Sequence, residues 1–340
     1  MRLRPLLPVL AALAVGCASS DDAPSLRSSE AMDAAAATIR AEDVIARIGV
    51  LADDSMRGRR TPSPELDMVA EWIAGEFAEM GLEPGGDDGS FVQRYPLPNG
   101  EEATAPNVVG ILPGSDPELR DEYVIYSAHM DHVGVRATEG GDSIFNGADD
   151  DASGTATVME VAEAMASLDV APRRSILFVL VSGEERGLWG SDYFTAHPPV
   201  PVEGMVANLN ADMVGRNWTD TIVAIGKEHS SLGGTLAEVN EAHPELGMTA
   251  IDDIWPEERF YFRSDHFNFA RRGVPVLFFF NGTHEDYHRP SDEVERIDGE
   301  KTSRIGRLLF YLGMEIADAD ERPTWDPESY RQIVEETDRE

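Results

Sequence analysis

The chain of 340 residues has little cysteine, few basic residues and only short apolar runs. It contains one cysteine, which excludes an intrachain disulfide, so stability must come from the core and from any bound metal. Its 28 Lys and Arg residues stand against 63 Asp and Glu residues, a formal net charge of −35. This balance argues against a nucleic-acid-binding surface and against charge-driven adhesion to anionic lipid. We expect a well-solvated acidic surface instead.

The first 17 residues have the pattern of a bacterial lipoprotein signal peptide. A basic start at residues 1–4 precedes an apolar stretch at 5–15 that is too short to span a bilayer as a helix. Cys17 follows small residues, as in the lipobox that this segment resembles, and an ordinary secretory leader is the alternative. We therefore expect export and a lipid anchor at Cys17, in the outer membrane, facing the periplasm or the cell exterior. Residues 18–34 are expected to form a flexible tether.

Short apolar runs and amphipathic segments alternate along the rest of the chain. Strands are predicted at residues 107–112, 123–128, 175–182, 205–211 and 274–280. Helices are predicted at residues 35–51, 66–80, 153–167, 187–196, 232–242 and 301–317. The alternation predicts an α/β fold, a three-layer α/β/α sandwich around a mixed, mostly parallel twisted sheet. With no internal repeat, residues 35–340 are expected to form a single domain.

Residues of the kind that bind metals follow the predicted strands. His129, Glu185 and Asp212 come after three of them, His288 follows the last one beyond a turn, and Asp150 lies in an Asp triplet between the first two. Because ligands of open α/β sheets bind at the carboxyl ends of the strands, we expect these side chains to converge. Imidazole and carboxylate groups are the ligands of zinc and similar ions. The sequence therefore predicts a metal site at this edge.

The set of side chains suits amide hydrolysis by two metal ions. Each metal needs about four ligands, and one shared carboxylate with one His and one further carboxylate per metal leaves room for a water. Glu184, next to a ligand in sequence, is a spare carboxylate that can face the water. Asp131, two residues after His129, is expected to hold the imidazole in the required tautomer.

Five motifs in sequence order resemble those of metallopeptidase family 28. They are His129-Met-Asp-His-Val-Gly134, Asn146-Gly-Ala-Asp-Asp-Asp-Ala-Ser-Gly154, Gly183-Glu-Glu-Arg-Gly-Leu188, Asn210-Ala-Asp-Met-Val-Gly215 and Asp286-Tyr-His-Arg-Pro-Ser-Asp292. This family comprises co-catalytic zinc exopeptidases, among them bacterial leucyl aminopeptidases and glutamate carboxypeptidases. The resemblance extends over residues 40–318. Residues 107–128 run without the protease-associated insert that many members carry.

The resemblance implies a role for each residue. One zinc would bind His129 and Asp212, the other Glu185 and His288, and Asp150 would bridge them, with Co²⁺ or Mn²⁺ as possible substitutes for the two Zn²⁺. The peptide bond after Asp150 is expected to be cis. Glu184 would be the general base, and Tyr287 and Arg263 match positions that stabilise the oxyanion in some members.

The implied function is an aminopeptidase that acts on peptides with a free N-terminus. A metal-bound hydroxide would attack the scissile carbonyl, and Glu184 would carry its proton to the leaving amine. A carboxypeptidase or dipeptidase is one alternative, and it would need a basic pocket, for which Arg263, Arg186 and Arg216 are the candidates. A glutaminyl cyclase with one working metal is a second alternative, and a catalytically inactive binding lipoprotein is a third. The sequence does not set the oligomeric state.

Some residues receive a different interpretation. The string H-E-x-x-H at 284–288 matches the zincin pattern, but Pro290 would disrupt a helix there, so we expect a loop with His288 as its only ligand. The polar loop at 53–64 is expected to be solvated, and the alternative is that its three Arg residues reach an anionic site. His132 is expected to be a hydrogen-bonded neighbour of the ligands.

Overall fold

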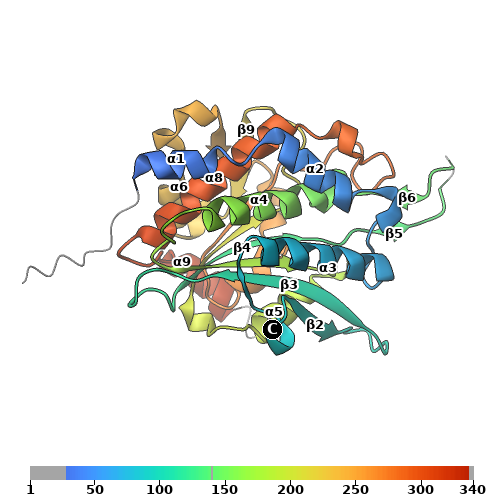
Figure 1. Ribbon diagram of the computed structural model, residues 1–340, viewed down its shortest axis with the longest axis horizontal. Coiled ribbons are helices and arrows are strands. Elements are labelled where there is room, and N and C mark those ends of the chain that lie inside the picture. The colour runs from blue at the N-terminus through green and yellow to red at the C-terminus, as the bar shows by residue number, and fades with distance from the viewer. Residues whose placement is uncertain (1–27, 139–140, 337–340) are drawn as a thin grey trace, which may run out of the picture.

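The computed structural model describes residues 28–138 and 141–336 (Figure 1), so Cys17 and the expected signal peptide lie outside the described residues. The helices are α1 Ser29–Ala36, α2 Ala41–Leu51, α3 Pro64–Glu79, α4 Gly154–Ala166, α5 Trp189–Ala196, α6 Leu232–Ala242, α7 His266–Ala270, α8 Gly299–Asp318 and α9 Pro327–Tyr330. The strands are β1 Glu83–Pro84, β2 Val92–Pro96, β3 Thr104–Leu112, β4 Tyr123–His129, β5 Gly134–Val135, β6 Ile144–Phe145, β7 Ser175–Val181, β8 Met205–Ala211, β9 Thr221–Ile225, β10 Thr249–Ile251 and β11 Val276–Phe279.

A nine-stranded mixed sheet forms the middle layer, with the strand order β1-β3-β7-β4-β8-β11-β9-β10 and with β2 paired to β3. The central strands β7, β4, β8 and β11 are parallel. On either side of them, β3 and β9 run antiparallel. The predicted mixed α/β sandwich is confirmed. Parallel pairing does not predominate as expected, because it is confined to the centre and to the pair β9 and β10, while β1, β2, β3 and β9 form antiparallel pairs. The four central strands end at one edge, where ligands of such sheets bind.

Helices cover both faces of the sheet, and each face has its own hydrophobic core. Helices α2, α3, α4, α6 and α8 lie on one face, and α5 and α7 lie on the other, as Figure 1 shows for α4 and α5. Strand β7 contributes to both cores, because Phe178 and Leu180 pack on one side and Val179 and Val181 on the other. Such a strand has a continuous apolar sequence, which is why the sequence predicts it well.

Two expectations about the N-terminal part are wrong. Residues 29–34, expected to belong to a flexible tether, lie in α1, which begins with a hydrogen bond from the Ala31 N–H to the Ser28 side chain. Its Ala-rich sequence favours a helix, and Tyr311 on α8 donates a hydrogen bond to Asp33 at 2.9 Å. The single helix expected at 35–51 is therefore two helices, separated by residues 37–40.

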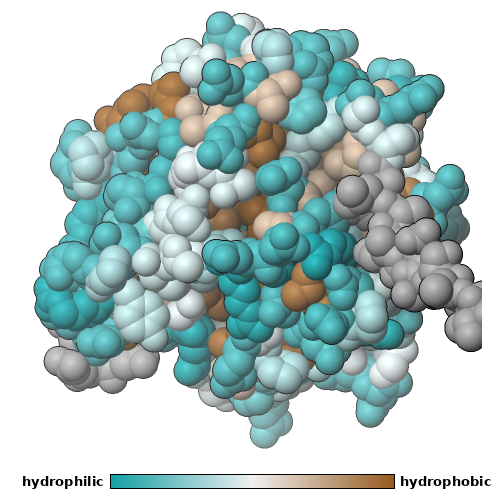
Figure 2. All heavy atoms as spheres, turned by 90° about the vertical axis from the view of Figure 1, so that its left-hand side faces the viewer, coloured by the Kyte–Doolittle hydropathy of each residue, from teal (hydrophilic) through white to brown (hydrophobic). Residues whose placement is uncertain are grey.

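The face of the molecule drawn in Figure 2 is largely hydrophilic, as the charge predicts. Figure 2 views the molecule from the left-hand side of Figure 1, and hydrophobic side chains appear there only in small patches. Among the described residues, no helix combines the length and the apolar character that a bilayer crossing requires. Strands β3 and β4 are joined directly by residues 113–122, so no insert lies between them.

Candidate metal centre

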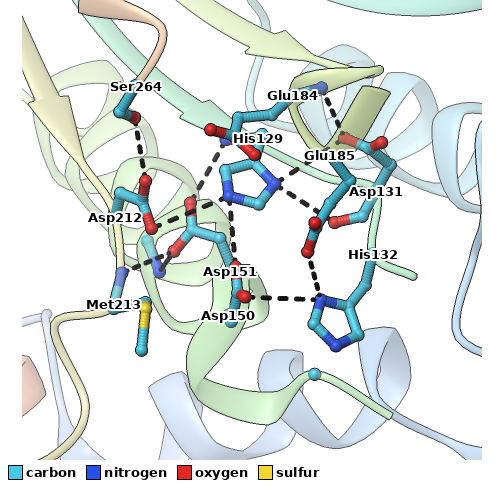
Figure 3. A network of polar contacts seen from close by, with 12 residues as sticks. His129, Asp131, His132, Asp150, Asp151, Glu184, Glu185, Asp212, Met213 and Ser264 are labelled. Carbon is cyan, nitrogen blue, oxygen red and sulfur yellow. Dashed lines mark hydrogen bonds and ion pairs between the residues drawn. The ribbon is translucent and has the colours of Figure 1, made fainter. Parts of the chain in front are cut away.

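The ends of parallel strands carry the predicted side chains to one place (Figure 3). His129 is the last residue of β4, and Asp212 follows β8 directly. After β7, Gly183 has a φ of 76° and turns the chain into the short helical turn Glu184–Arg186. A Cβ atom on Gly183 would lie 2.6 Å from the Tyr95 hydroxyl, so the turn requires glycine.

Asp150 lies between two groups of metal-type side chains and belongs to both. Its Oδ1 is 3.3 Å from Nε2 of His129, and Oδ1 of Asp212 is 3.7 Å from the same nitrogen. Its Oδ2 is 3.1 Å from Nε2 of His288, and Oε1 of Glu185 is 3.0 Å from that nitrogen. The structure thus brings the five predicted metal ligands together around one shared carboxylate.

The chemistry of these donors fits divalent metal ions. Oδ2 of Asp150 and Oε1 of Glu185 are buried, and neither has a hydrogen-bond partner within the described part of the chain. A buried carboxylate oxygen is costly unless a cation or a donor compensates it. Burial raises the pKa of Asp150, but the surrounding imidazoles, that of His132 foremost, hold it well below its usual range. The residues therefore fit a cation at each of the two groups.

Backbone hydrogen bonds fix the segment that contains Asp150. The side chain of Asp151 accepts hydrogen bonds at 2.8–3.2 Å from the backbone N–H groups of His129, Gly154 and Met213. The side chain of Asp292 accepts from the N–H groups of Asp149 and Asp150 at 3.0–3.1 Å. The Asp150–Asp151 peptide bond is cis, as the resemblance predicts. Asp151 thus links the segment around Asp150 to the chain at His129 and at Met213.

Arg59 supports the same segment from beneath, contrary to the expectation of a solvated loop. Its side chain is 0% exposed. It donates hydrogen bonds to the carbonyl oxygens of Met130, Leu51, Asn146, Gly147 and Asp150. The physical reason for the error is that loop composition predicts average exposure and does not distinguish Arg59 from Arg57, which is 58% exposed in the same loop.

Glu184 lines the same cavity as the first group of donors, His129, Asp150 and Asp212. Burial raises the pKa of its carboxyl group well above the usual range, and nearby carboxylates such as Asp212 add to this, while His129 opposes it. A carboxyl group with a raised pKa is suited to accept and return a proton near neutral pH.

Asp131 lies between His129 and the Glu184 turn. Nδ1 of His129 is 3.2 Å from the Asp131 carbonyl oxygen and 3.6 Å from its carboxylate, so Nε2 faces the acidic groups. The carboxylate accepts hydrogen bonds from the backbone N–H of Glu184 at 3.3 Å and from the hydroxyl of Thr61 at 2.8 Å. Thr61 belongs to the same loop as Arg59, so a second residue of that loop is buried against the centre.

Tyr287 and Arg263 both line the cavity, but in different ways. The ring of Tyr287 stacks on His288 with centroids 4.0 Å apart, and burial raises its pKa, so its hydroxyl remains a donor. The side chain of Arg263 is 53% exposed, and its guanidinium lies over the ring of Phe260 and 3.6 Å from Glu258. Arg263 is therefore at the rim, outside the cluster of donors.

The H-E-x-x-H string does not form a helix. His284 contacts Asp149, with Nε2 3.1 Å from Oδ2, whereas His288 contacts Asp150 and Glu185. The two imidazoles contact different acids, so the string is no zincin site.

Comparison with known proteins agrees with the resemblance. The profile of the family described as Peptidase family M28 matches residues 107–313. A protein named "Probable zinc metalloprotease" from Leptosphaeria maculans is 28% identical over 291 residues, covering 72% of this chain and 65% of its own length. Aminopeptidase YwaD of Bacillus subtilis is 27% identical over 231 residues, covering 65% of this chain and 46% of its own length. The chain thus spans less than two thirds of these relatives.

Solved structures share the fold. The LapA aminopeptidase of Legionella pneumophila superimposes with a TM-score of 0.67 at 22% identity, over 87% of this chain and 76% of LapA. The zinc aminopeptidase BSAP of Bacillus subtilis gives a TM-score of 0.62 at 16% identity, over 81% of this chain and 94% of BSAP.

Proposed function

The chain belongs to peptidase family M28, and on this premise we propose that it is a zinc-dependent aminopeptidase that removes N-terminal residues from peptides. The observation that carries the proposal is that donors converge on both oxygens of Asp150, His129 and Asp212 on one side and His288 and Glu185 on the other, with Glu184 beside them. Bound zinc lowers the pKa of a water molecule and polarises the scissile carbonyl. One zinc would bind His129 and Asp212, and a second would bind Glu185 and His288.

The remaining side chains act on protons and charge. Glu184 accepts a proton from the attacking water and passes it to the leaving amine. Asp131 orients His129 so that Nε2 is available, and it positions the Glu184 turn through its backbone N–H. The Tyr287 hydroxyl, kept protonated by burial, donates to the oxyanion that develops on the carbonyl. Arg263 reaches this position only after its guanidinium leaves Phe260 and Glu258.

The charges around the cavity favour an aminopeptidase over a carboxypeptidase. A substrate carboxylate needs a cationic partner, and each of the three candidate Arg residues already has contacts. Arg263 lies against Glu258, Arg216 pairs with Asp286 at 3.0 Å, and Arg186 lies over the ring of Trp189. An aminopeptidase needs no such cation, because the free α-amine of its substrate would bind a zinc ion or a carboxylate at the rim of the cavity.

A matched pair of substrates and one variant test the proposal. We expect the metal-loaded protein to cleave leucyl amides with a free α-amine, to spare the N-blocked analogues, and to lose activity in a chelator. Glu184→Gln should retain both metals and lower kcat by about 10²–10⁴, the contribution of a general base. Cleavage of the N-blocked amides would refute an aminopeptidase, and a near-normal rate in Glu184→Gln would refute the role of the base.

Metal content distinguishes a peptidase from a glutaminyl cyclase and from an inactive binding protein. Two zinc ions per chain with hydrolysis of amides support the peptidase, whereas release of pyroglutamate from N-terminal glutamine with one working metal would support a glutaminyl cyclase. Metal binding without either activity would indicate a binding protein.

We also propose that the protein is exported and lipidated at Cys17, on the pattern of the first 17 residues. Cells that express the full chain should incorporate labelled fatty acid into the protein, and Cys17→Ser should abolish the label. A labelled Cys17→Ser variant, or an unlabelled native protein, would refute the anchor.

A further inference from the structure

His132 is a buried histidine at the metal centre to which the five-ligand scheme gives no role. It lies three residues beyond His129, and its side chain is 0% exposed. Neither ring nitrogen has a hydrogen-bond partner within residues 28–138 and 141–336. The expectation of a hydrogen-bonded neighbour is therefore wrong. An imidazole kept from water without a partner is costly, so the environment must offer it another kind of interaction.

The nitrogen Nδ1 of His132 points toward the acidic groups (Figure 3). It is 3.0 Å from Oε1 of Glu185 and 3.6 Å from Oδ2 of Asp150. Both of these carboxylate oxygens also lack a hydrogen-bond partner among the described residues. Three polar atoms thus lie close together without the alignment of a hydrogen bond. In a tetrahedral zinc site with bonds near 2.0–2.2 Å, ligand atoms lie about 3.3 Å apart, so the spacing is that of donors around a common ion.

The ring of His288 completes this arrangement. Its Nε2 is 3.0 Å from Oε1 of Glu185 and 3.1 Å from Oδ2 of Asp150. The ring centroids of His132 and His288 are 5.6 Å apart at an interplanar angle of 72°. Two imidazoles on one tetrahedral zinc have their centroids about 5 Å apart, given bonds of about 2.0 Å to nitrogen. Gly147 permits this packing, because a Cβ atom there would lie 2.5 Å from the His132 ring.

We propose that His132 is a fourth protein ligand of the second metal, together with Asp150, Glu185 and His288. The proposal rests on the two-metal function above. It makes the two halves of the site unequal, because His129, Asp150 and Asp212 supply three ligands to the first metal. A zinc with four protein ligands is closed, and one with three keeps a position for water. The reactive water then belongs to the first metal, next to Glu184.

Substitution of the ligand by a thiolate tests direct contact. His132→Cys places a sulfur near the position of Nδ1, and the protein is loaded with Co²⁺ in place of Zn²⁺. A thiolate bound to Co²⁺ gives a near-ultraviolet charge-transfer band that an unbound thiol does not give. We expect this band in His132→Cys and not in the native protein or in His266→Cys. His266 is a matched control because it is also 0% exposed but stacks on Phe278. A folded, cobalt-loaded His132→Cys without the band overturns the proposal.

Two further measurements do not depend on that variant. In the native cobalt protein, every metal-bound imidazole contributes one exchangeable, hyperfine-shifted N–H proton resonance, and we expect three such resonances instead of two. In His132→Ala, affinity for the second zinc, measured by competition with a chromophoric chelator, should fall more than about 100-fold. Loss of a residue that only orients a ligand costs about 10–100-fold. Two resonances, or a loss below about 100-fold, refute direct ligation.

These results are separable from the proposed function. If the native protein binds two metals and cleaves aminoacyl amides while the His132 variants keep native metal binding, only the role of His132 fails. If the native protein binds no second metal, the two-metal function fails first.

Discussion

Replacing Arg59 by methionine should destabilise the protein severely, although the residue lies in a polar surface-like sequence. All five N–H groups of its guanidinium donate to carbonyl oxygens, and three of these acceptors belong to the segment 146–150 that carries the shared acid. Burial lowers the pKa of Arg59, while the carboxylates of Asp150, Asp131 and Asp151 oppose that shift. The charge therefore also balances buried acids.

The loss of stability in Arg59→Met can be estimated from the buried carbonyl oxygens that lose their hydrogen-bond donor. A buried acceptor that loses its donor costs about 1–3 kcal/mol. Five such losses do not add fully, because carbonyl oxygens keep a second lone pair for other donors, as Gly147 does for the Ala152 N–H. Removing one partner of a buried charge pair costs about 3–5 kcal/mol in proteins, and we expect a loss in this range. A domain with a total stability of about 5–15 kcal/mol would lose a large fraction of it.

Urea denaturation of the metal-free protein, followed by circular dichroism, measures this loss. Arg57→Met is the matched control, because Arg57 is exposed in the same loop and pairs with Glu65 at 3.3 Å. We expect the control to change the free energy of unfolding by less than about 1 kcal/mol, as exposed ion pairs contribute little. Equal midpoints for the two variants would refute the structural role of Arg59.

Three further predictions concern other parts of the molecule. Burial raises the pKa of Glu160 on α4 from 4.5 to about 7, so the folded protein binds this proton more tightly than the unfolded chain does. The free energy of unfolding should therefore fall as the pH rises from about 4.5 to about 7, by up to about 3 kcal/mol. Glu160→Gln should lack this loss in urea titrations, and parallel pH profiles would contradict it. Gly190→Ala should lower the free energy of unfolding by more than about 2 kcal/mol, because the new Cβ atom would overlap the carbonyl oxygen of Ser182. Gly75→Ala should raise it by about 0.5–1 kcal/mol, because Gly75 lies within α3 and has open space around its Cβ position. Equal melting temperatures for the two glycine variants would contradict that contrast. Tyr287→Phe should lower kcat about 100-fold at unchanged metal content, and a loss of metal would assign Tyr287 to ligand support instead.

The sequence predicts the parts of the site that are tied to strand ends. His129 ends β4 and Asp212 follows β8, and both strands are largely buried, so their ends are readable as the points where imidazole or carboxylate side chains begin. Parallel pairing then places these ends together without any knowledge of loops.

Contacts made by loops and chain ends are not predictable in the same way. Arg59 and Thr61 reach the centre because the loop between α2 and α3 folds under it, and a polar composition fits an exposed loop equally well. His132 lies in a recognised motif, but the direction of its ring depends on packing against Gly147. The break between α1 and α2 lies where the apolar spacing continues, and there Arg307 on α8 donates a hydrogen bond to the carbonyl oxygen of Ile39.

The charge within the centre explains why so many acids can lie together. Without metal, protons must compensate the carboxylates. Burial lowers the pKa of His288, but Asp150 and Glu185 raise it to about 10, and burial raises the pKa of Asp151 well above its usual range. Arg59 is a buried cation next to residues 146–150, but its N–H groups already donate to backbone carbonyl oxygens and not to these carboxylates. Two divalent ions would supply the positive charge that protons otherwise provide, which leaves the imidazole nitrogens free to act as ligands. Because protons and metal ions compete for the same carboxylates and imidazoles, the affinity of this centre for metal ions should fall steeply as the pH decreases.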